Sequence, residues 1–288
     1  MCVQNNGIFD GPVDQTAVSA IVAWHANTVR VPLNEDCWLG INGAPGQYSG
    51  SNYQNAIEQF VSLLRKNGLY VILDLHWNAG GGNEAWSQQQ MADADHSPTF
   101  WGSVAGAFKS DLGVVFDLYN EPHDIAWSCW LDGGCQVSGW NVAGMQQLVD
   151  AVRGAGAQNV VMVGGLGYAG DLSQWLANKP SDPTGNLAAS FHTYNFTGCA
   201  SSSCWTSTIQ PVAAQVPVVT GELGENDCAH GYIDGYMSWA DGAGVSYLGW
   251  AWNADFNCNS GPGLVSDWTG TPTAFGQGLQ AHLAVVNP

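Results

Sequence analysis

Short apolar runs alternate with amphipathic stretches along the whole chain. Runs rich in Val, Ile and Leu predict buried strands at 28–31, 70–75, 114–119, 160–163, 187–192, 218–221 and 247–252. Helical spacing of apolar positions predicts helices at 14–26, 53–67, 99–109, 140–154, 231–240 and 273–285. Such alternation is typical of an α/β protein with a parallel sheet covered by helices.

Seven strands are one short of a (β/α)8 barrel, the TIM-barrel architecture that a chain of 288 residues suits. We expect one catalytic barrel domain over residues 1–288, with the first strand missing from the sequence. A doubly wound open sheet is the alternative, and it is disfavoured because polar residues follow nearly every strand. We also expect a longer form to carry a short apolar strand just before Met1, because two unpaired strand edges would otherwise remain.

Charge and composition restrict the partners. Six Lys and Arg face 24 Asp and Glu, which gives a net charge of −18 and argues against nucleic acid or an anionic membrane as partner. Eight cysteines indicate an oxidising compartment, so we expect a secreted protein, acting as a monomer on a neutral substrate. Some of the 14 Trp could serve as platforms for sugar rings.

Two glutamates stand directly after predicted strands. Asn120-Glu121-Pro122 follows the run at 114–119, and Glu222 follows the run at 218–221. Strand ends of a parallel barrel meet at one face, so both carboxyl groups should lie together. Cleavage of a glycosidic bond needs such a pair, one as acid and the other as base or nucleophile.

Further strand ends carry polar or aromatic residues: Arg30, His76, Asn120, His192, Tyr194 and Trp252. Together with Glu121 and Glu222, in this order, they form a set that resembles family 5 of the glycoside hydrolases, the cellulase-containing family of retaining (β/α)8 enzymes. The resemblance runs from Arg30 to Trp252 and departs from the family at the N-terminus, where the first strand is missing.

The resemblance implies a role for each residue. Glu222 would be the nucleophile, with Arg30 and Tyr194 as donors to it, and Glu121 the general acid and then the base. The charge of Glu222 would raise the pKa of Glu121.

The remaining residues of the set would hold the sugar. Asn120 would bind the 2-hydroxyl, and His76 other hydroxyls of the reacting sugar. His192 would tune Glu121 or contact substrate, and Trp252 would stack under the ring.

No metal or cofactor is expected. His-Glu-x-x-His, Gly-x-Ser-x-Gly and a full dinucleotide fingerprint are all missing from the sequence. Asp93, Asp95 and His96 gather in one predicted loop, where a solvated loop or a helix cap is a more frequent explanation than a metal site.

All eight cysteines fall on loops at one face of the expected barrel. Eight cysteines allow 105 pairings. Proximity favours Cys2–Cys37, Cys129–Cys135, Cys199–Cys204 and Cys228–Cys258.

The function expected is that of a retaining endo-β-1,4-glucanase. A β-mannanase or an exo-acting β-glycosidase or diglycosidase of the same family remains an alternative. A non-catalytic carbohydrate-binding barrel would lack one of the two carboxylates, and an enzyme for phosphorylated metabolites would need a basic cluster that this acidic chain does not show.

Overall fold

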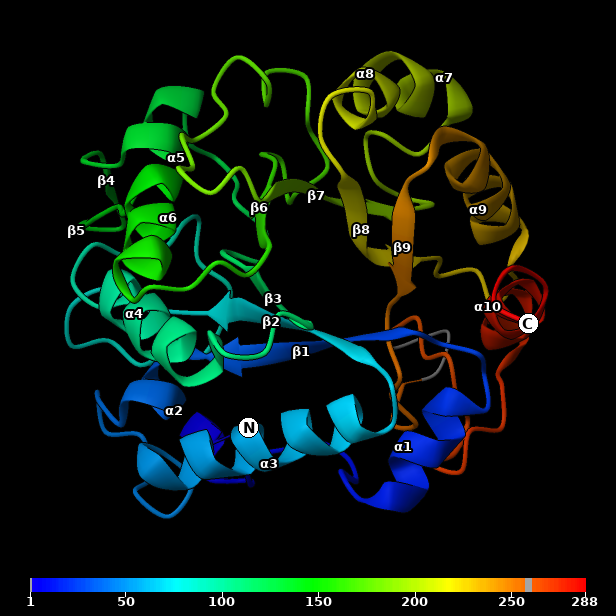
Figure 1. Ribbon diagram of the computed structural model, residues 1–288, viewed down its shortest axis with the longest axis horizontal. Coiled ribbons are helices and arrows are strands. Elements are labelled where there is room, and N and C mark those ends of the chain that lie inside the picture. Colours follow the sequence, from blue (N-terminus) through cyan, green and yellow to red (C-terminus); the bar gives the residue numbers. More distant parts are fainter. Residues whose placement is uncertain (1, 257–260) are drawn as a thin grey trace.

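The computed structural model describes residues 2–256 and 261–288. Seven parallel strands form one curled sheet in the order β1-β2-β3-β6-β7-β8-β9. Figure 1 shows the helices on the outer side of this sheet, with α3 below, α4 and α6 on one flank and α9 and α10 on the other. The chain is therefore an α/β protein whose curled parallel sheet forms an incomplete barrel, as the sequence predicts.

The strands are β1 (Thr28–Asn34), β2 (Tyr70–Trp77), β3 (Val114–Asp117), β6 (Val161–Gly164), β7 (Leu187–Tyr194), β8 (Val218–Gly224) and β9 (Ser246–Gly249), with a separate hairpin of β4 (Gln136–Val137) and β5 (Trp140–Asn141). The helices are η1 (Cys2–Gln4), α1 (Gln15–Val22), α2 (Glu35–Leu39), α3 (Ser51–Lys66), α4 (Ser97–Phe108), α5 (Trp127–Asp132), α6 (Met145–Gly154), α7 (Ser202–Cys204), η2 (Trp205–Ile209), α8 (Gln210–Ala213), α9 (Gly231–Ala243) and α10 (Ala274–Val286).

All seven predicted strands and six predicted helices are present, with shifted ends. The predicted strand at 247–252 is too long, because β9 ends at Gly249 and Trp252 lies beyond it. The predicted helix at 140–154 begins too early, because Trp140 and Asn141 pair in the hairpin before α6. Short elements such as α2 and α5 carry too few apolar repeats to be predicted.

The sheet does not close within the described residues: β1 pairs only with β2, and β9 only with β8. The expectation of seven strands is confirmed, and the first residues form the short helix η1 instead of a strand. A cavity of about 1020 Å³ opens beside these two edges. It is lined by the apolar side chains of the barrel interior, among them Ile72, Val115, Met162, Ala188, Val219 and Leu248.

Side-chain caps set where several helices begin. The carboxylate of Asp14 accepts a hydrogen bond from the Ala17 backbone N–H at 3.0 Å and starts α1. Asn34, the last residue of β1, accepts from the Cys37 N–H at 3.1 Å and turns the chain directly into α2. The end of β1 is thereby linked to a helix without a connecting loop.

Three of the expected disulfides are present: Cys2–Cys37, Cys129–Cys135 and Cys199–Cys204. Cys258, a member of the fourth expected pair, lies outside the described residues. The first disulfide ties η1 to α2, while the other two close short loops beyond β3 and β7. In the described part of the chain, no helix has the length and apolar character needed to cross a membrane.

Alanine substitutions at two helical glycines, Gly276 in α10 and Gly235 in α9, test how tightly α10 packs against its neighbours. A Cβ at Gly276 would clash with the carbonyl oxygen of Leu264, whereas a Cβ at Gly235 in α9 would meet no atom within 4 Å. We expect Gly276→Ala to destabilise the fold by about 1–3 kcal/mol through overpacking. Gly235→Ala should be neutral or stabilising by up to about 1 kcal/mol, because alanine is the better helix former. Urea unfolding of both variants measures this, and equal midpoints would contradict the packing of α10.

Candidate active site

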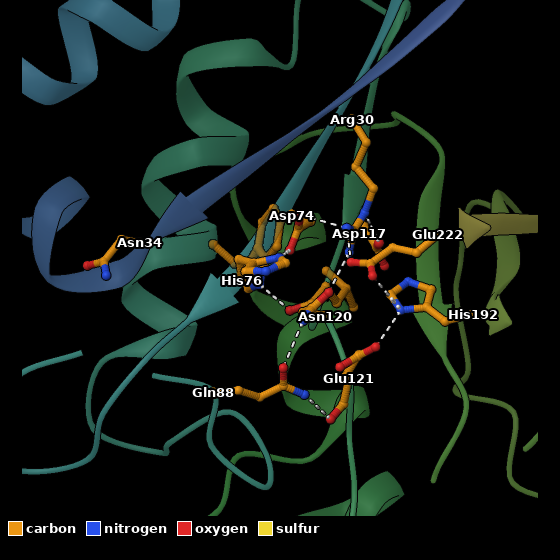
Figure 2. A network of polar contacts seen from close by, with 12 residues as sticks. Arg30, Asn34, Asp74, His76, Gln88, Asp117, Asn120, Glu121, His192 and Glu222 are labelled. Atoms are coloured by element: carbon orange, nitrogen blue, oxygen red, sulfur yellow. Dashed lines mark hydrogen bonds and ion pairs between the residues drawn. The ribbon is translucent and has the colours of Figure 1, made fainter. Parts of the chain in front are cut away.

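Arg30 lies at the centre of a polar cluster at the C-terminal ends of the strands (Figure 2). Its Nε donates to Asp117 Oδ2 at 3.0 Å, Nη1 to Glu222 Oε1 at 2.9 Å and Nη2 to Asn120 Oδ1 at 2.9 Å. Nη1 also lies 3.3 Å from Asp74 Oδ2. One guanidinium therefore connects side chains from or just after β1, β2, β3 and β8.

Burial and neighbouring charges shift the pKa values of Arg30 and Asp117 in this cluster. Desolvation alone would lower the pKa of Arg30, but Asp74, Asp117 and Glu222 outweigh it and raise that pKa above its usual range. Burial raises the pKa of Asp117 to about 6, although Arg30 acts in the opposite direction. Arg30 is thus a permanent cation among three carboxyl groups.

A β-bulge positions Glu222. In the ladder between β7 and β8, Phe191 pairs with Thr220 and His192 pairs with Glu222, so Gly221 is the extra residue. A Cβ at Gly221 would lie only 2.9 Å from His192 Nε2, so a larger residue there would displace the imidazole. The bulge turns Glu222 toward the barrel axis beside His192. A second bulge, between β1 and β2, falls at His76.

Glu222 accepts hydrogen bonds on both carboxylate oxygens. Arg30 donates to Oε1, and the Tyr194 hydroxyl donates to Oε2 at 2.5 Å. Burial and the charge of Glu222 raise the pKa of Tyr194 well above its usual value, so its hydroxyl keeps the proton that it donates. Both oxygens of Glu222 are thereby held by donors, which fixes the orientation of its carboxyl group.

Glu121 lies on the other side of His192. His192 Nδ1 is 3.0 Å from Glu121 Oε1 and 3.7 Å from Glu222 Oε2. One carboxylate oxygen of each glutamate and a His192 ring nitrogen all lie within 4.8 Å of one another. The backbone before Glu121 continues the strand ladder, since the Asn120 N–H donates to the Leu75 carbonyl at 3.1 Å.

The expected direction of the Glu121 pKa shift is wrong. Burial favours the neutral acid, but the hydrogen bond and the charge of His192 outweigh it and lower the pKa of Glu121 below its usual value. Burial also opposes an imidazolium, yet Glu222 and Glu121 raise the pKa of His192. A proton held between these two side chains therefore belongs to the His192–Glu121 pair and not to either residue alone, a coupling that the sequence does not reveal.

The other predicted strand-end residues, His76, Tyr194 and Trp252, make contacts with aromatic side chains around the site. His76 Nδ1 lies 3.2 Å from Asp74 Oδ1, and its ring stacks on Trp250 with 5.4 Å between centroids. Tyr194 stacks on the exposed Phe196. Trp252 packs edge-on against Trp24 and, like His76, lines the interior cavity.

Sequence reasoning missed several residues of the site. Gln88 accepts a hydrogen bond from Asn120 Nδ2 at 3.2 Å and donates one to the Glu121 carbonyl at 3.0 Å (Figure 2). It lies in a long loop with no periodic pattern, so no signal in the sequence points to it. Asp74 and Asp117 could have been found, because each places a carboxylate inside an otherwise apolar strand run.

A family model described as "Cellulase (glycosyl hydrolase family 5)" matches residues 5–256. The chain belongs to glycosyl hydrolase family 5. The family predicted from the strand-end residues is therefore confirmed.

Two curated relatives of this family member have different substrates in their names. A mannan endo-1,4-beta-mannosidase of Salipaludibacillus agaradhaerens is 23% identical over 88% of this chain and 76% of its own length. Endoglucanase 1 of Robillarda sp. (strain Y-20) is 32% identical, but over 59% of this chain and 46% of its own length. The chain is thus a family 5 glycosidase whose relatives include both specificities.

Solved structures show the same fold. A beta-glucanase from Saccharophagus degradans in complex with cellotetraose superposes with a TM-score of 0.71 at 19% identity, over 95% of this chain and 83% of that one. An endo-beta-1,4-glucanase from Xanthomonas axonopodis pv. citri with three substitutions gives 0.71 at 21% identity, over 93% and 89%. At this identity the likeness establishes the barrel fold alone.

Replacing His192 tests the shared proton. In the native site, loss of the proton from the pair should set the alkaline limb of the kcat/KM profile, at the raised pKa of His192. In His192→Gln only Glu121 can hold that proton, so the limb should move to lower pH. Measuring the pH–rate profile of both proteins decides this.

His123→Gln is the matched control for this experiment. His123 Nδ1 contacts the Glu121 carbonyl oxygen at 2.9 Å, and no contact of its ring with the Glu121 carboxylate is found in the described part of the chain. The alkaline limb of the kcat/KM profile of His123→Gln should lie at the same pH as that of the unmodified protein. An unmoved limb in His192→Gln would show that His192 holds no part of the acid proton.

Proposed function

We propose that this protein is a retaining endo-β-1,4-glucanase that uses Glu222 as nucleophile and Glu121 as acid and base. The single observation that carries the proposal is the pair of carboxylates, which approach within 4.8 Å with His192 beside both. Retaining glycosidases hold their carboxyl groups about 5–5.5 Å apart, and inverting ones leave about 6.5–9.5 Å for a water molecule.

The first step of the proposed reaction forms a glycosyl-enzyme. A Glu222 carboxylate oxygen bonds to the anomeric carbon while the bond from that carbon to the leaving oxygen breaks, and Glu121 gives its proton to that oxygen. Arg30 and Tyr194 donate hydrogen bonds that hold the carboxylate of Glu222 in a fixed orientation.

The second step hydrolyses this ester. Glu121 now takes a proton from water, whose oxygen bonds to the anomeric carbon and displaces Glu222. The charge of Glu222 is absent during this step, which eases ionisation of Glu121. His192, whose Nδ1 lies 3.0 Å from Glu121 Oε1, adjusts the proton affinity of Glu121 in both steps.

Asn120 is the residue that we assign to the sugar 2-hydroxyl. Its amide is fixed at both ends, because Oδ1 accepts from Arg30 and Nδ2 donates to Gln88. A fixed amide can distinguish the equatorial 2-hydroxyl of glucose from the axial one of mannose. The cellotetraose complex of the Saccharophagus relative and the endoglucanase at 32% identity support glucan as substrate.

An extracellular location and a monomeric state belong to the same proposal. Three disulfides support an oxidising compartment. A net charge of −18 opposes self-association and favours a neutral polymer over an anionic partner.

A panel of purified polysaccharides tests the substrate. We expect reducing ends to appear from carboxymethyl cellulose and mixed-linkage β-glucan at rates at least about tenfold above those from β-mannan. Viscosity should fall early relative to reducing-end release, as internal cleavage requires. Faster hydrolysis of mannan would favour the activity named for the Salipaludibacillus relative, and slow viscosity loss would indicate exo action.

Carboxylate variants test the assignment of roles. Glu222→Ala and Glu121→Ala should each lower kcat by about 10²–10⁴-fold or more. Azide should rescue Glu222→Ala with inverted product, because a small anion fills the space of the nucleophile. In Glu121→Ala azide should rescue only turnover of an aryl glycoside whose leaving group needs no acid.

Glu58→Ala is the control, because Glu58 is an exposed carboxylate on α3 far from the sheet ends. Its activity should equal that of the unmodified protein. Full activity in either active-site variant would contradict the roles assigned to the pair.

A further inference from the structure

A second buried acidic cluster lies outside the catalytic site. Glu35 is the first residue of α2, Asp93 ends the segment between β2 and α4, and His96 precedes α4. Both carboxylates are completely buried, whereas the His96 side chain is 23% exposed. The sequence predicts a solvated loop or a helix cap here. Asp93 is buried and not solvated, and its Oδ1 accepts a hydrogen bond from the His96 N–H at 2.8 Å just before α4, while Asp95 lies at the surface.

Hydrogen bonds satisfy only part of this cluster. Ser97 Oγ lies 2.6 Å from Glu35 Oε2 and 3.1 Å from Asp93 Oδ2, but its single hydrogen can be donated to only one of them. Asn78 Nδ2 donates to Asp93 Oδ2 at 2.9 Å. Asp93 Oδ1 in turn accepts from the His96 backbone N–H. Asp93 is thus bonded at both oxygens, whereas among the described residues Glu35 is bonded only through Oε2, to Ser97.

Two atoms in the cluster face each other without a partner. Within the described residues, Glu35 Oε1 and His96 Nδ1 are buried and make no hydrogen bond, and they lie 3.9 Å apart. Asp93 Oδ1 lies 3.4 Å from the same His96 nitrogen. One ligand atom from each of the three residues falls within 4.8 Å of the other two, a spacing that a central cation would bridge.

Among the described residues, no arginine or lysine compensates this charge. Across residues 2–256 and 261–288, every ion pair of an arginine or lysine is made elsewhere: Arg30 at the catalytic site, Arg65 with Asp111 and Arg153 with Asp182. Asp36, also buried, adds a third carboxyl group beside the cluster. Burial of unpaired carboxylates is costly, so either protons or a cation must neutralise them.

We propose that Glu35, Asp93 and His96 bind a divalent first-row transition cation such as Zn²⁺ or Mn²⁺. One imidazole nitrogen with two carboxylate oxygens suits such ions better than Ca²⁺ or Mg²⁺, which prefer all-oxygen shells. The cation occupies the space between Glu35 Oε1, the near Asp93 oxygen and His96 Nδ1. The partly exposed imidazole gives it a route from solvent.

The cation would fasten the loop that supports the catalytic acid. Asp93 and His96 end the segment 78–96, and Gln88 within it contacts Asn120 and Glu121. Ala85 of the same segment donates its N–H to Asp36 at 2.8 Å and accepts from Asn34 at 2.8 Å. A cation between Glu35 and Asp93 adds a third link between this segment and the start of α2.

Metal content and thermal stability test the proposal on the full chain. After removal of metals with a chelator, Zn²⁺ should bind at about one equivalent, and Mn²⁺ more weakly. At a free Zn²⁺ concentration of about 100 times Kd, Tm should rise by about 5 °C, and Ca²⁺ should give no such rise.

Glu35→Gln separates a cation site from an ordinary buried hydrogen bond. The substitution keeps the shape and removes one negative charge, so without metal its Tm should equal or exceed that of the unmodified protein. It should lose the Zn²⁺-dependent rise, and His96→Gln should lose it as well.

His282→Gln is the matched control. His282 contacts a single carboxylate, Asp241, at 2.9 Å, and it belongs to no group of three ligand atoms in the described chain. The His282→Gln variant should keep the full Zn²⁺-dependent rise in Tm. Glu222→Gln should keep it too, which distinguishes this site from the three catalytic groups that also lie within 4.8 Å of one another.

The opposite results would overturn the proposal. If Zn²⁺ and Mn²⁺ leave Tm unchanged and bind at less than one equivalent, protons alone neutralise the cluster. If Glu35→Gln and His96→Gln keep the rise, the ion binds elsewhere. If Glu222→Gln abolishes it, the ion occupies the catalytic site.

Discussion

The geometry of the candidate active site depends on the contacts of the buried Arg30 guanidinium. It bonds Asp117, Asn120 and Glu222 at 2.9–3.0 Å and lies 3.3 Å from Asp74. It thereby connects β1 with residues of β3 and β8, two strands with which β1 forms no backbone ladder. Because β1 and β9 do not pair, this side chain gives Glu222 a direct link to β1 across the open side of the sheet. Leaving any of these carboxylates without the cation would bury an uncompensated charge, which is strongly destabilising.

The sheet supplies the second requirement, which is the direction of each side chain. An uninterrupted strand would send neighbouring residues to opposite faces, so Glu222 could not lie opposite His192 while Thr220 stays opposite Phe191. The extra residue Gly221 resolves this conflict, and the absence of a side chain there leaves room for the imidazole. The bulge is therefore part of the site, although its residue touches no substrate.

Residue types at strand ends made most of the fold and the candidate site predictable. Apolar runs revealed every strand of the sheet, and their ends held Arg30, Glu121, His192 and Glu222, which the structure brings together. What could not be predicted depends on contacts between segments distant in sequence. Gln88 reaches Asn120 across 32 residues, and the lowered pKa of Glu121 follows from the place of His192 between two carboxylates.

The shortage of basic residues links the two buried acidic clusters. With six Lys and Arg for 24 Asp and Glu, the chain cannot give each buried carboxylate its own cation. At the catalytic site one arginine serves three carboxylates, and its rigid fork allows it to bond several acceptors at once. Around Glu35 and Asp93 the basic group found in the described part of the chain is the His96 imidazole, whose Nδ1 lies close to both carboxylates yet bonds neither. The same shortage thus has two different consequences. In the Arg30 cluster, a permanently charged side chain neutralises the buried carboxylates. At Glu35, Asp93 and His96, the proposed exchangeable cation does so and holds the segment 78–96 in place.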